Sequence, residues 1–302
     1  MKKVSRERVG TELDGMFSGP DPVRAMTDIN RLRLFPAVFT VTPDAEAKLP
    51  SNWGEPCVQL VTAASATLAA VNFQVNVGKE EVKVALLSAL LLPVRALASK
   101  GKKGKSLPVV PLIVGESMKW KKSYATLAAE VQAQAPELLK VYQTLQGLGG
   151  SWQESAPEEL RTKLGMAVRQ LKGNWRIGTI IASLLPSSSA KSLGIDSAEA
   201  DASESESRSG SSADADEDNT DTNVAARVAC CHSLESAVMA FKLDKCWQEA
   251  GWLALLDGQQ IKAATGAAGP QIGKITHKLM QWQLAHPDAS QQDAKQWLSS
   301  LQ

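Results

Sequence analysis

The sequence predicts an all-α protein, an elongated array of helices with a disordered acidic insertion. Apolar residues recur at spacings of three and four along most of the 302 residues, which is the period of an amphipathic helix. Gly and Pro break these runs into lengths that suit ordinary helices. The stretch 186–223 differs, because Ser, Asp, Glu and Ala dominate it and leave too little apolar content to fold.

The first residues predict a helical hairpin. Ser5 can cap the first helix, and Gly19-Pro20 can end it. Asp21 can cap a second helix that starts with Pro22, since Pro suits the first helical position. The residues at helical spacing that we expect to face inward are Val9, Leu13, Met16 and Phe17 in the first helix, and Val23, Met26 and Ile29 in the second.

A pair of helices is predicted over 57–98, with a break near Asn76-Val77-Gly78. β-branched residues in 59–77 would also suit a strand, but the Ala-rich run 63–70 favours a helix. A loop of Gly and Lys follows at 100–105. The further helices predicted from apolar spacing lie at 109–118, 122–147, 157–172 and 174–184.

Helix is expected to return at about 224–243, and the end of the chain predicts a compact helical module. Asp257-Gly258 indicates a turn, Gly269-Pro270 starts a helix and His286-Pro287 stops it. The segment 290–293 resembles a capping box for a final helix. The residues expected to face inward are Ile272, Ile275, Leu279 and Trp282 in the first of these helices, and Ala294, Trp297, Leu298 and Leu301 in the second.

Charge is unevenly distributed along the chain. The net charge is only +1, but ten of the 32 acidic residues lie between Asp196 and Asp221, where Arg208 is the only basic residue. The rest of the chain therefore carries 32 basic and 22 acidic residues. A basic body favours a polyanionic partner, although ordinary solvation by Lys and Arg would give the same balance.

The four cysteines do not suggest a secreted disulfide framework in a chain of this length. Cys230, Cys231, His232 and Cys246 could suggest a zinc site, but adjacent helical residues point in different directions and no CxxC is present. We therefore predict no metal site and expect reduced, mostly buried thiols, including Cys57.

No apolar run approaches the roughly 18 residues that a membrane-spanning helix needs. The first residues also lack the apolar stretch of a secretory signal. We expect an intracellular protein without a membrane partner. Cytoplasm, nucleus, mitochondrion and plastid are not distinguished.

Two motifs stand near the start of the chain, Ser5-Arg6-Glu7-Arg8-Val9-Gly10-Thr11-Glu12 and Gly19-Pro20-Asp21-Pro22-Val23-Arg24-Ala25. Both resemble the neck of eukaryotic class II CCA-adding enzymes (CCA tRNA nucleotidyltransferases), especially the plant and algal type. The segment 103–110 resembles the body of the plant enzymes, while 269–274 and 279–287 resemble the tail of the family. The resemblance covers about 1–40, 100–123, a weaker stretch at 175–185, and 242–302.

The resemblance implies four parts: a neck remainder at 1–40, a helical body at 41–185, an acidic linker at 186–223, and the body end with the tRNA-binding tail at 224–302. In the neck, the positions that support the nucleotide-reading helix match Ser5, Glu7, Arg8 and Glu12. The catalytic head of the family would precede this chain, so no catalytic residue is assigned. Mg²⁺, CTP and ATP are implied only for the full-length enzyme, and a separate catalytic head is a conceivable partner.

Lysines flank the region that resembles the family body. Flexible lysines neutralise phosphates without reading sequence, so we expect RNA-backbone contacts from Lys100, Lys102, Lys103, Lys105, Lys119, Lys121 and Lys122. Trp120 lies among them and could either stack on a base or pack in the core. In the tail, where the family holds the tRNA elbow, the expected RNA-binding residues are Gly269, Gly273, Lys274 and Lys278.

Nucleotidyl transfer needs two positioned carboxylates for metal ions. The only Asp-x-Asp, Asp214-Ala215-Asp216, lies in the acidic segment, and we reject it as a metal site. We therefore expect this chain to be inactive by itself and to bind tRNA for CCA addition. The alternatives are a non-catalytic RNA-binding or adaptor protein derived from the family, and a relative of poly(A) polymerases, against which the tail motif argues.

Overall fold

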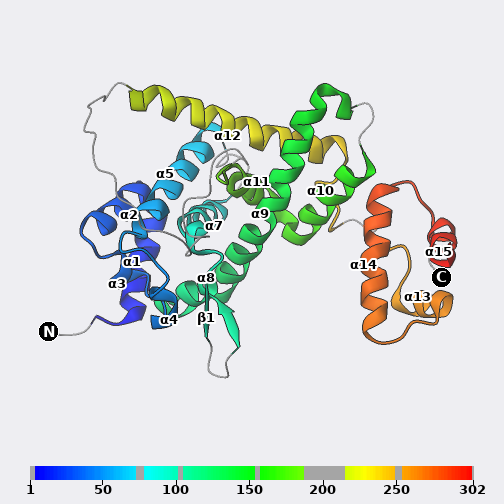
Figure 1. Ribbon diagram of the computed structural model, residues 1–302, viewed down its shortest axis with the longest axis horizontal. Coiled ribbons are helices and arrows are strands. Elements are labelled where there is room, and N and C mark those ends of the chain that lie inside the picture. Colours follow the sequence, from blue (N-terminus) through cyan, green and yellow to red (C-terminus); the bar gives the residue numbers. More distant parts are fainter. Residues whose placement is uncertain are drawn as a thin grey trace, which may run out of the picture. The chain divides into compact units, whose positions relative to one another are not determined.

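The computed structural model confirms that the protein is helical (Figure 1). It describes residues 4–72, 78–100, 105–153, 157–186, 215–248 and 254–300. Within these ranges the strands form a single two-stranded sheet. The chain divides into two compact units. Unit 1 combines Met1–Pro136 with Ile177–His232, and unit 2 combines Glu137–Arg176 with Ser233–Gln302. The four-part division expected from the sequence stays a prediction.

The hairpin predicted at the start of the chain is present in unit 1. Helix α1 (Arg6–Ser18) begins after Ser5, whose hydroxyl accepts from the Arg8 N–H, and α2 (Pro22–Arg31) begins after Asp21. One expectation about the buried face is wrong. Met16 is exposed, whereas Gly10 is buried with Leu13 and Phe17, because another segment of the chain packs directly against α1 at that glycine.

The predicted pair of helices is also confirmed. It consists of α5 (Gly54–Ala70) and α7 (Lys79–Leu90), which pack against each other. Of the predicted break, Gly78 immediately precedes α7, and Asn76 and Val77 lie outside the described residues. The whole apolar run after Lys83 is buried, which makes α7 the centre of the core of unit 1. Short helical turns complete the first part of this unit: α3 (Phe35–Val38), α4 (Pro43–Glu46) and the 3₁₀ turn η1 (Leu92–Val94).

The segment after α7 differs from the prediction. The predicted helix does not reach residue 98, because Leu92-Pro93-Val94 forms the 3₁₀ turn and an antiparallel hairpin follows. Strand β1 (Ala98–Lys100) pairs with β2 (Ser106–Pro108), so that Ser99 lies opposite Leu107. The expected Gly/Lys loop is the connection between the strands, and residues 101–104 lie outside the described residues.

Asp44 fixes this hairpin to the short helix α4. Its carboxylate accepts the Lys100 N–H at 2.7 Å and the Ser99 hydroxyl at 3.2 Å. The Lys100 N–H, with help from the Thr42 and Ser99 hydroxyls, lowers the pKa of Asp44 to about 2. Two very short strands are hardly stable alone. This tertiary anchor explains why a segment with no strand signal becomes a hairpin.

The helices predicted from apolar spacing in the middle of the chain are confirmed. The first is one α-helical turn, α8 (Val109–Leu112), continued by a π-helical turn, η2 (Ile113–Ser117). The others are α9 (Lys122–Leu148), α10 (Glu158–Leu171) and α11 (Trp175–Ser183). Two 3₁₀ turns, η3 (Gly149–Gln153) and η4 (Lys172–Asn174), flank α10.

The acidic segment is shorter than expected. Helix α12 (Ala215–Ala240) begins before residue 224, so 215–223 is helical and not part of a linker. The sequence there is acidic, and negative charge favours the N-terminal turn of a helix. Residues 187–214, most of the predicted disordered insertion, lie outside the described residues.

The predicted C-terminal module forms part of unit 2. It contains α13 (Gly258–Thr265), α14 (Pro270–Ala285) and α15 (Gln291–Ser300). These helices share an apolar core of Leu256, Ile261, Leu279, Ala294 and Leu298. Asp257 does not form an isolated turn. It caps α13 by a reciprocal capping box with Gln260, while the predicted box of Ser290 with Asp293 is confirmed.

Helix α14 also packs on α10, within unit 2. The side chain of Leu284 occupies the space beside Gly165, where an added methyl would approach it to 2.6 Å. Arg161 Nε donates to the Leu284 carbonyl at 2.7 Å, and Thr162 donates to the Gln281 carbonyl at 3.3 Å. The C-terminal half of α14 is therefore held by α10, while residues along the helix from Ile272 to Trp282 pack in the core shared with α13 and α15.

The four cysteines are buried and free, as expected. Burial raises the pKa of the Cys57 and Cys230 thiols, and it raises that of Cys246 to about 11. Among the residues that the structure describes, none of the helices combines the length and the apolar character needed to cross a bilayer.

Candidate nucleic-acid interface

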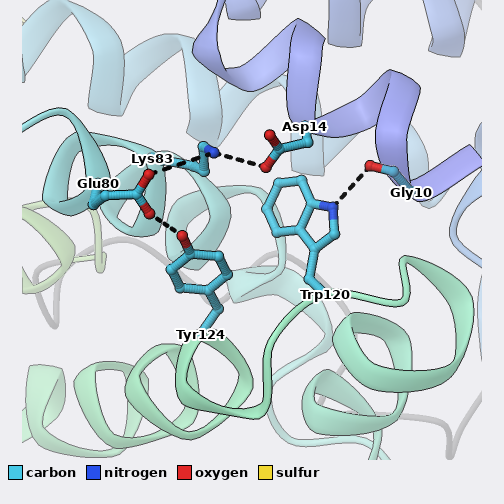
Figure 2. A network of polar contacts seen from close by, with 6 residues as sticks. All are labelled: Gly10, Asp14, Glu80, Lys83, Trp120 and Tyr124. Carbon is cyan, nitrogen blue, oxygen red and sulfur yellow. Dashed lines mark hydrogen bonds and ion pairs between the residues drawn. The ribbon is translucent and has the colours of Figure 1, made fainter. Parts of the chain in front are cut away.

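The neck motif and the lysine-rich segment around Trp120 meet in unit 1 (Figure 2). The Trp120 indole N–H donates to the Gly10 carbonyl at 3.0 Å. A methyl on Gly10 would overlap the Met118 carbonyl oxygen and lie 3.0 Å from its carbon. Gly10 is thus the point at which α1 can approach the backbone before Lys119.

A buried lysine that the sequence analysis missed holds this junction together. Lys83, with a side chain only 6% exposed, places its Nζ 2.7 Å from Asp14 Oδ1 and 3.9 Å from Glu80 Oε1. Figure 2 shows the same ammonium group beside the rings of Trp120 and Tyr124. The Lys83 Nζ lies 5.6 Å from the centroid of the Trp120 ring and 6.0 Å from that of the Tyr124 ring. The Tyr124 hydroxyl in turn donates to Glu80.

Lys83 therefore connects α1, α7 and α9 through one cation. A cation over an aromatic face gains more when water is excluded, and so does an ion pair. No signal in the sequence distinguishes Lys83 from a surface lysine, since its partners Asp14 and Trp120 are distant along the chain.

Of the two interpretations of Trp120, the structure shows the packed one. Its ring is half-buried and meets Phe17 edge to face, with centroids 5.3 Å apart. Its N–H bonds to Gly10 and its ring contacts Phe17, so Trp120 anchors the lysine-rich segment to α1. Lys119, Lys121 and Lys122 remain exposed around it.

The four residues of the predicted neck site are all exposed: Ser5 caps α1, Glu7 and Arg8 lie in its first turn, and Glu12 lies near its middle. Hydrogen bonds from its own backbone N–H and from the Ser5 hydroxyl lower the pKa of Glu7, and the charge of Lys119 acts in the same direction. No ion pair joins Arg8 to Glu12 among the described residues. Support for a nucleotide site by these residues stays a prediction.

The predicted lysines divide into two groups. Lys100 and Lys105 are exposed on the β-hairpin, and Lys102 and Lys103 lie outside the described residues. The second group, Lys119, Lys121 and Lys122, flanks Trp120, whose indole N–H donates to α1 at Gly10. Lys119 Nζ is 3.1 Å from Glu116, and Lys121 Nζ lies 5.9 Å from the Tyr124 ring centroid.

In unit 2, Lys274 and Lys278 are exposed one helical turn apart on α14. They border a groove of about 380 Å³ between the end of α13, α14 and α15. Its lining combines small and apolar residues with the two cations: Thr265, Gly266, Ala267, Gln271, Lys274, Ile275, Lys278 and Leu298. Gly266 and Gly269 both adopt positive φ, at 69° and 55°, where glycine is favoured.

The start of α14 offers fewer free N–H groups than the sequence suggests. The Gln271 N–H donates to the Ala268 carbonyl at 3.3 Å, and the Ile272 N–H donates to the Gly269 carbonyl at 3.2 Å. Gly273 is exposed inside the helix, and a methyl there would meet no atom within 4 Å. Packing within the chain therefore does not explain why residue 273 is glycine.

In the described part of the chain, no group of three or more His, Cys, Asp or Glu side chains could hold a metal ion. Asp214 of the rejected Asp-x-Asp sequence lies outside that part. Comparisons of this chain with protein-family models, with curated proteins and with solved structures found no match.

Proposed function

We propose that this chain holds tRNA by its phosphate backbone, as the neck, body and tail of a CCA-adding enzyme. The proposal rests on the sequence motifs of neck and tail, and it is supported by the exposed cations on both units. The observation that carries it is the pair Lys274 and Lys278 beside the groove of the C-terminal module.

Positive charge is concentrated on this helix. Helix α14 contains no Asp or Glu. The carboxylates of Asp257 and Asp293 accept hydrogen bonds at the starts of α13 and α15. Among the described residues no ion pair involves Lys274 or Lys278, so a polyanion can neutralise both charges.

The same pair does not stabilise the helix that carries it. Like charges four residues apart destabilise a helix by about 0.2–0.5 kcal/mol. Gly273 beside them adds a further cost of about 0.5–1 kcal/mol relative to Ala. A surface that binds phosphates explains both residues, since the lysines supply charge and the glycine lets a backbone approach closely.

The test is equilibrium binding of the whole chain to a tRNA that ends before CCA, measured between 50 and 200 mM salt. The binding constant falls as salt rises, so the slope of log K against log salt is negative. Lys274→Gln with Lys278→Gln should make this slope shallower by about 1.4–1.8, since each phosphate contact contributes about 0.7–0.9. The affinity gap between the two salt concentrations should then shrink about tenfold.

A matched control removes two lysines whose charges are already paired. Lys140 and Lys163 lie in unit 2 and contact Glu137 and Glu159 on their own helices, each at 2.7 Å. Lys140→Gln with Lys163→Gln changes net charge equally and should leave the slope nearly unchanged. Equal effects of the two double variants would contradict a specific role for α14.

The chemistry is tested in the same preparation. With Mg²⁺, CTP and ATP, we expect tRNA binding without nucleotide addition, because the motif that would hold catalytic metal ions is not recognised in this sequence. Incorporation of labelled CTP by the purified chain would show that the catalytic part of the proposal is wrong.

A further inference from the structure

Basic residues occupy most of the backbone positions where this chain adopts positive φ without glycine. In the described residues these positions are Arg33, Asn72, Lys119, Lys172 and Lys242. Only 33 of the 302 residues are Lys or Arg, so four cations among five such positions are far more than composition gives. Outside glycine, Asn, Asp and His are the residues usually enriched there.

Each of the four cations follows the end of a helical segment. After α2, the Arg33 N–H donates to the Asn30 carbonyl and the Leu34 N–H to the Ile29 carbonyl, at 2.8 and 2.9 Å. After α12, the same pattern recurs around Lys242. This arrangement ends helices with a left-handed residue, for which glycine is the usual choice. Lys119 follows the π-helical turn η2.

Lys172 is the clearest case. At the end of α10 it has φ 55° and ψ −134°, while Gly269 has nearly the same angles, 55° and −128°. The chain thus uses glycine for this conformation at one position and lysine at another. Glycine would fit position 172 without a Cβ conflict, and position 173 is itself glycine.

The fold itself makes little use of these charges. All four side chains belong to exposed residues. Among the described residues only Lys119 has a carboxylate partner, Glu116 at 3.1 Å. A cation at a helix C-terminus gains some dipole energy, but glycine there would remove the backbone strain altogether.

We infer that Arg33, Lys119, Lys172 and Lys242 contact the phosphate backbone of bound RNA, and that binding has kept cations where the backbone favours glycine. This inference rests on the proposed function. It adds three residues, Arg33, Lys172 and Lys242, that the sequence motifs do not indicate. Strained backbone is often retained at functional sites, where a substitution that improves stability impairs the function.

The inference predicts opposite effects on stability and on binding. Lys172→Gly and Lys242→Gly should each raise the Tm of the whole chain by about 1–2 °C. Each should also make the negative slope of log K against log salt for tRNA shallower by about 0.7–0.9. Arg33→Gly should behave in the same way.

Two controls separate charge from backbone. Asn72→Gly relieves the same kind of strain without removing a charge, so it should raise Tm and leave tRNA binding unchanged. Lys172→Gln removes the charge and keeps the side chain, so it should weaken tRNA binding without the gain in Tm.

The outcomes are distinct. Glycine variants with a higher Tm and unchanged binding would overturn the inference and leave the proposed function intact, provided that the wild-type chain binds tRNA. A wild-type chain that does not bind tRNA at any salt concentration would overturn both. A lower Tm in the glycine variants would remove the premise of backbone strain.

Discussion

Replacing Gly10 by alanine is the sharpest test of how the neck helix is attached. In a solvent-exposed helix the change would stabilise by about 0.5–1 kcal/mol, because alanine loses less backbone freedom on folding. Here the new methyl would overlap the Met118 carbonyl oxygen, which is backbone and cannot rotate away. Either α1 or the segment 118–122 must shift.

The magnitude follows from two terms. Overpacking in a close-packed interior costs about 1–3 kcal/mol. A shift also weakens the hydrogen bond from Trp120 Nε1 to the Gly10 carbonyl, which contributes about 0.5–1.5 kcal/mol. After subtracting the gain in helix propensity, we expect Gly10→Ala to lower the free energy of unfolding by about 1–3 kcal/mol.

Urea denaturation followed by tryptophan fluorescence measures this difference. Gly15 provides the control, because it lies in the same helix, is exposed, and has no atom within 4 Å of an added methyl. Gly15→Ala should raise the unfolding midpoint while Gly10→Ala lowers it. If both substitutions stabilise the chain, α1 does not pack on Met118 as described.

Two further predictions concern unit 2. Gly273→Ala should stabilise the chain by about 0.5–1 kcal/mol, yet weaken tRNA binding. Gly147, in α9, is also exposed with open space around it, so Gly147→Ala should stabilise the chain without affecting tRNA binding. Equal tRNA affinities of the two variants would refute a close approach of RNA at α14. The second concerns Cys246, whose pKa is raised by burial from 9.0 to about 11. Its stabilising effect is complete below pH 9 and is lost as pH rises toward 11, because the unfolded thiol ionises first. The stability difference between wild type and Cys246→Ala, measured by urea unfolding, should therefore shrink over this range, and a constant difference would contradict the burial of the thiol.

Local rules were sufficient for the helices and their ends. The caps at Ser5, Asp21 and Ser290 depend on neighbours within three residues, and each was predictable because short-range hydrogen bonds decide it. The same holds for the apolar spacing that placed α9 and α10. The binding residues stay predictions, although exposure of the described lysines agrees with what backbone binding requires.

Residues distant in sequence decided the remainder. Met16 was expected on the buried face of α1. Because α1 packs at Gly10 against Met118, the buried face consists of Gly10, Leu13 and Phe17, and Met16 is exposed. Nothing near Lys83 in the sequence indicates that it is buried, yet its ammonium group pairs with Asp14 beside the Trp120 ring.

Taken alone, the amino-acid sequence determined that this protein is helical, where most helices begin and end, and where its positive charge gathers. Only the tertiary structure decided which glycine permits close packing, which lysine is buried, and that 98–100 pairs with 106–108 as strands. The reason is the separation along the sequence between the residues that interact. A cap or an apolar period is set within one or two helical turns, whereas the Trp120–Gly10 hydrogen bond joins residues 110 positions apart.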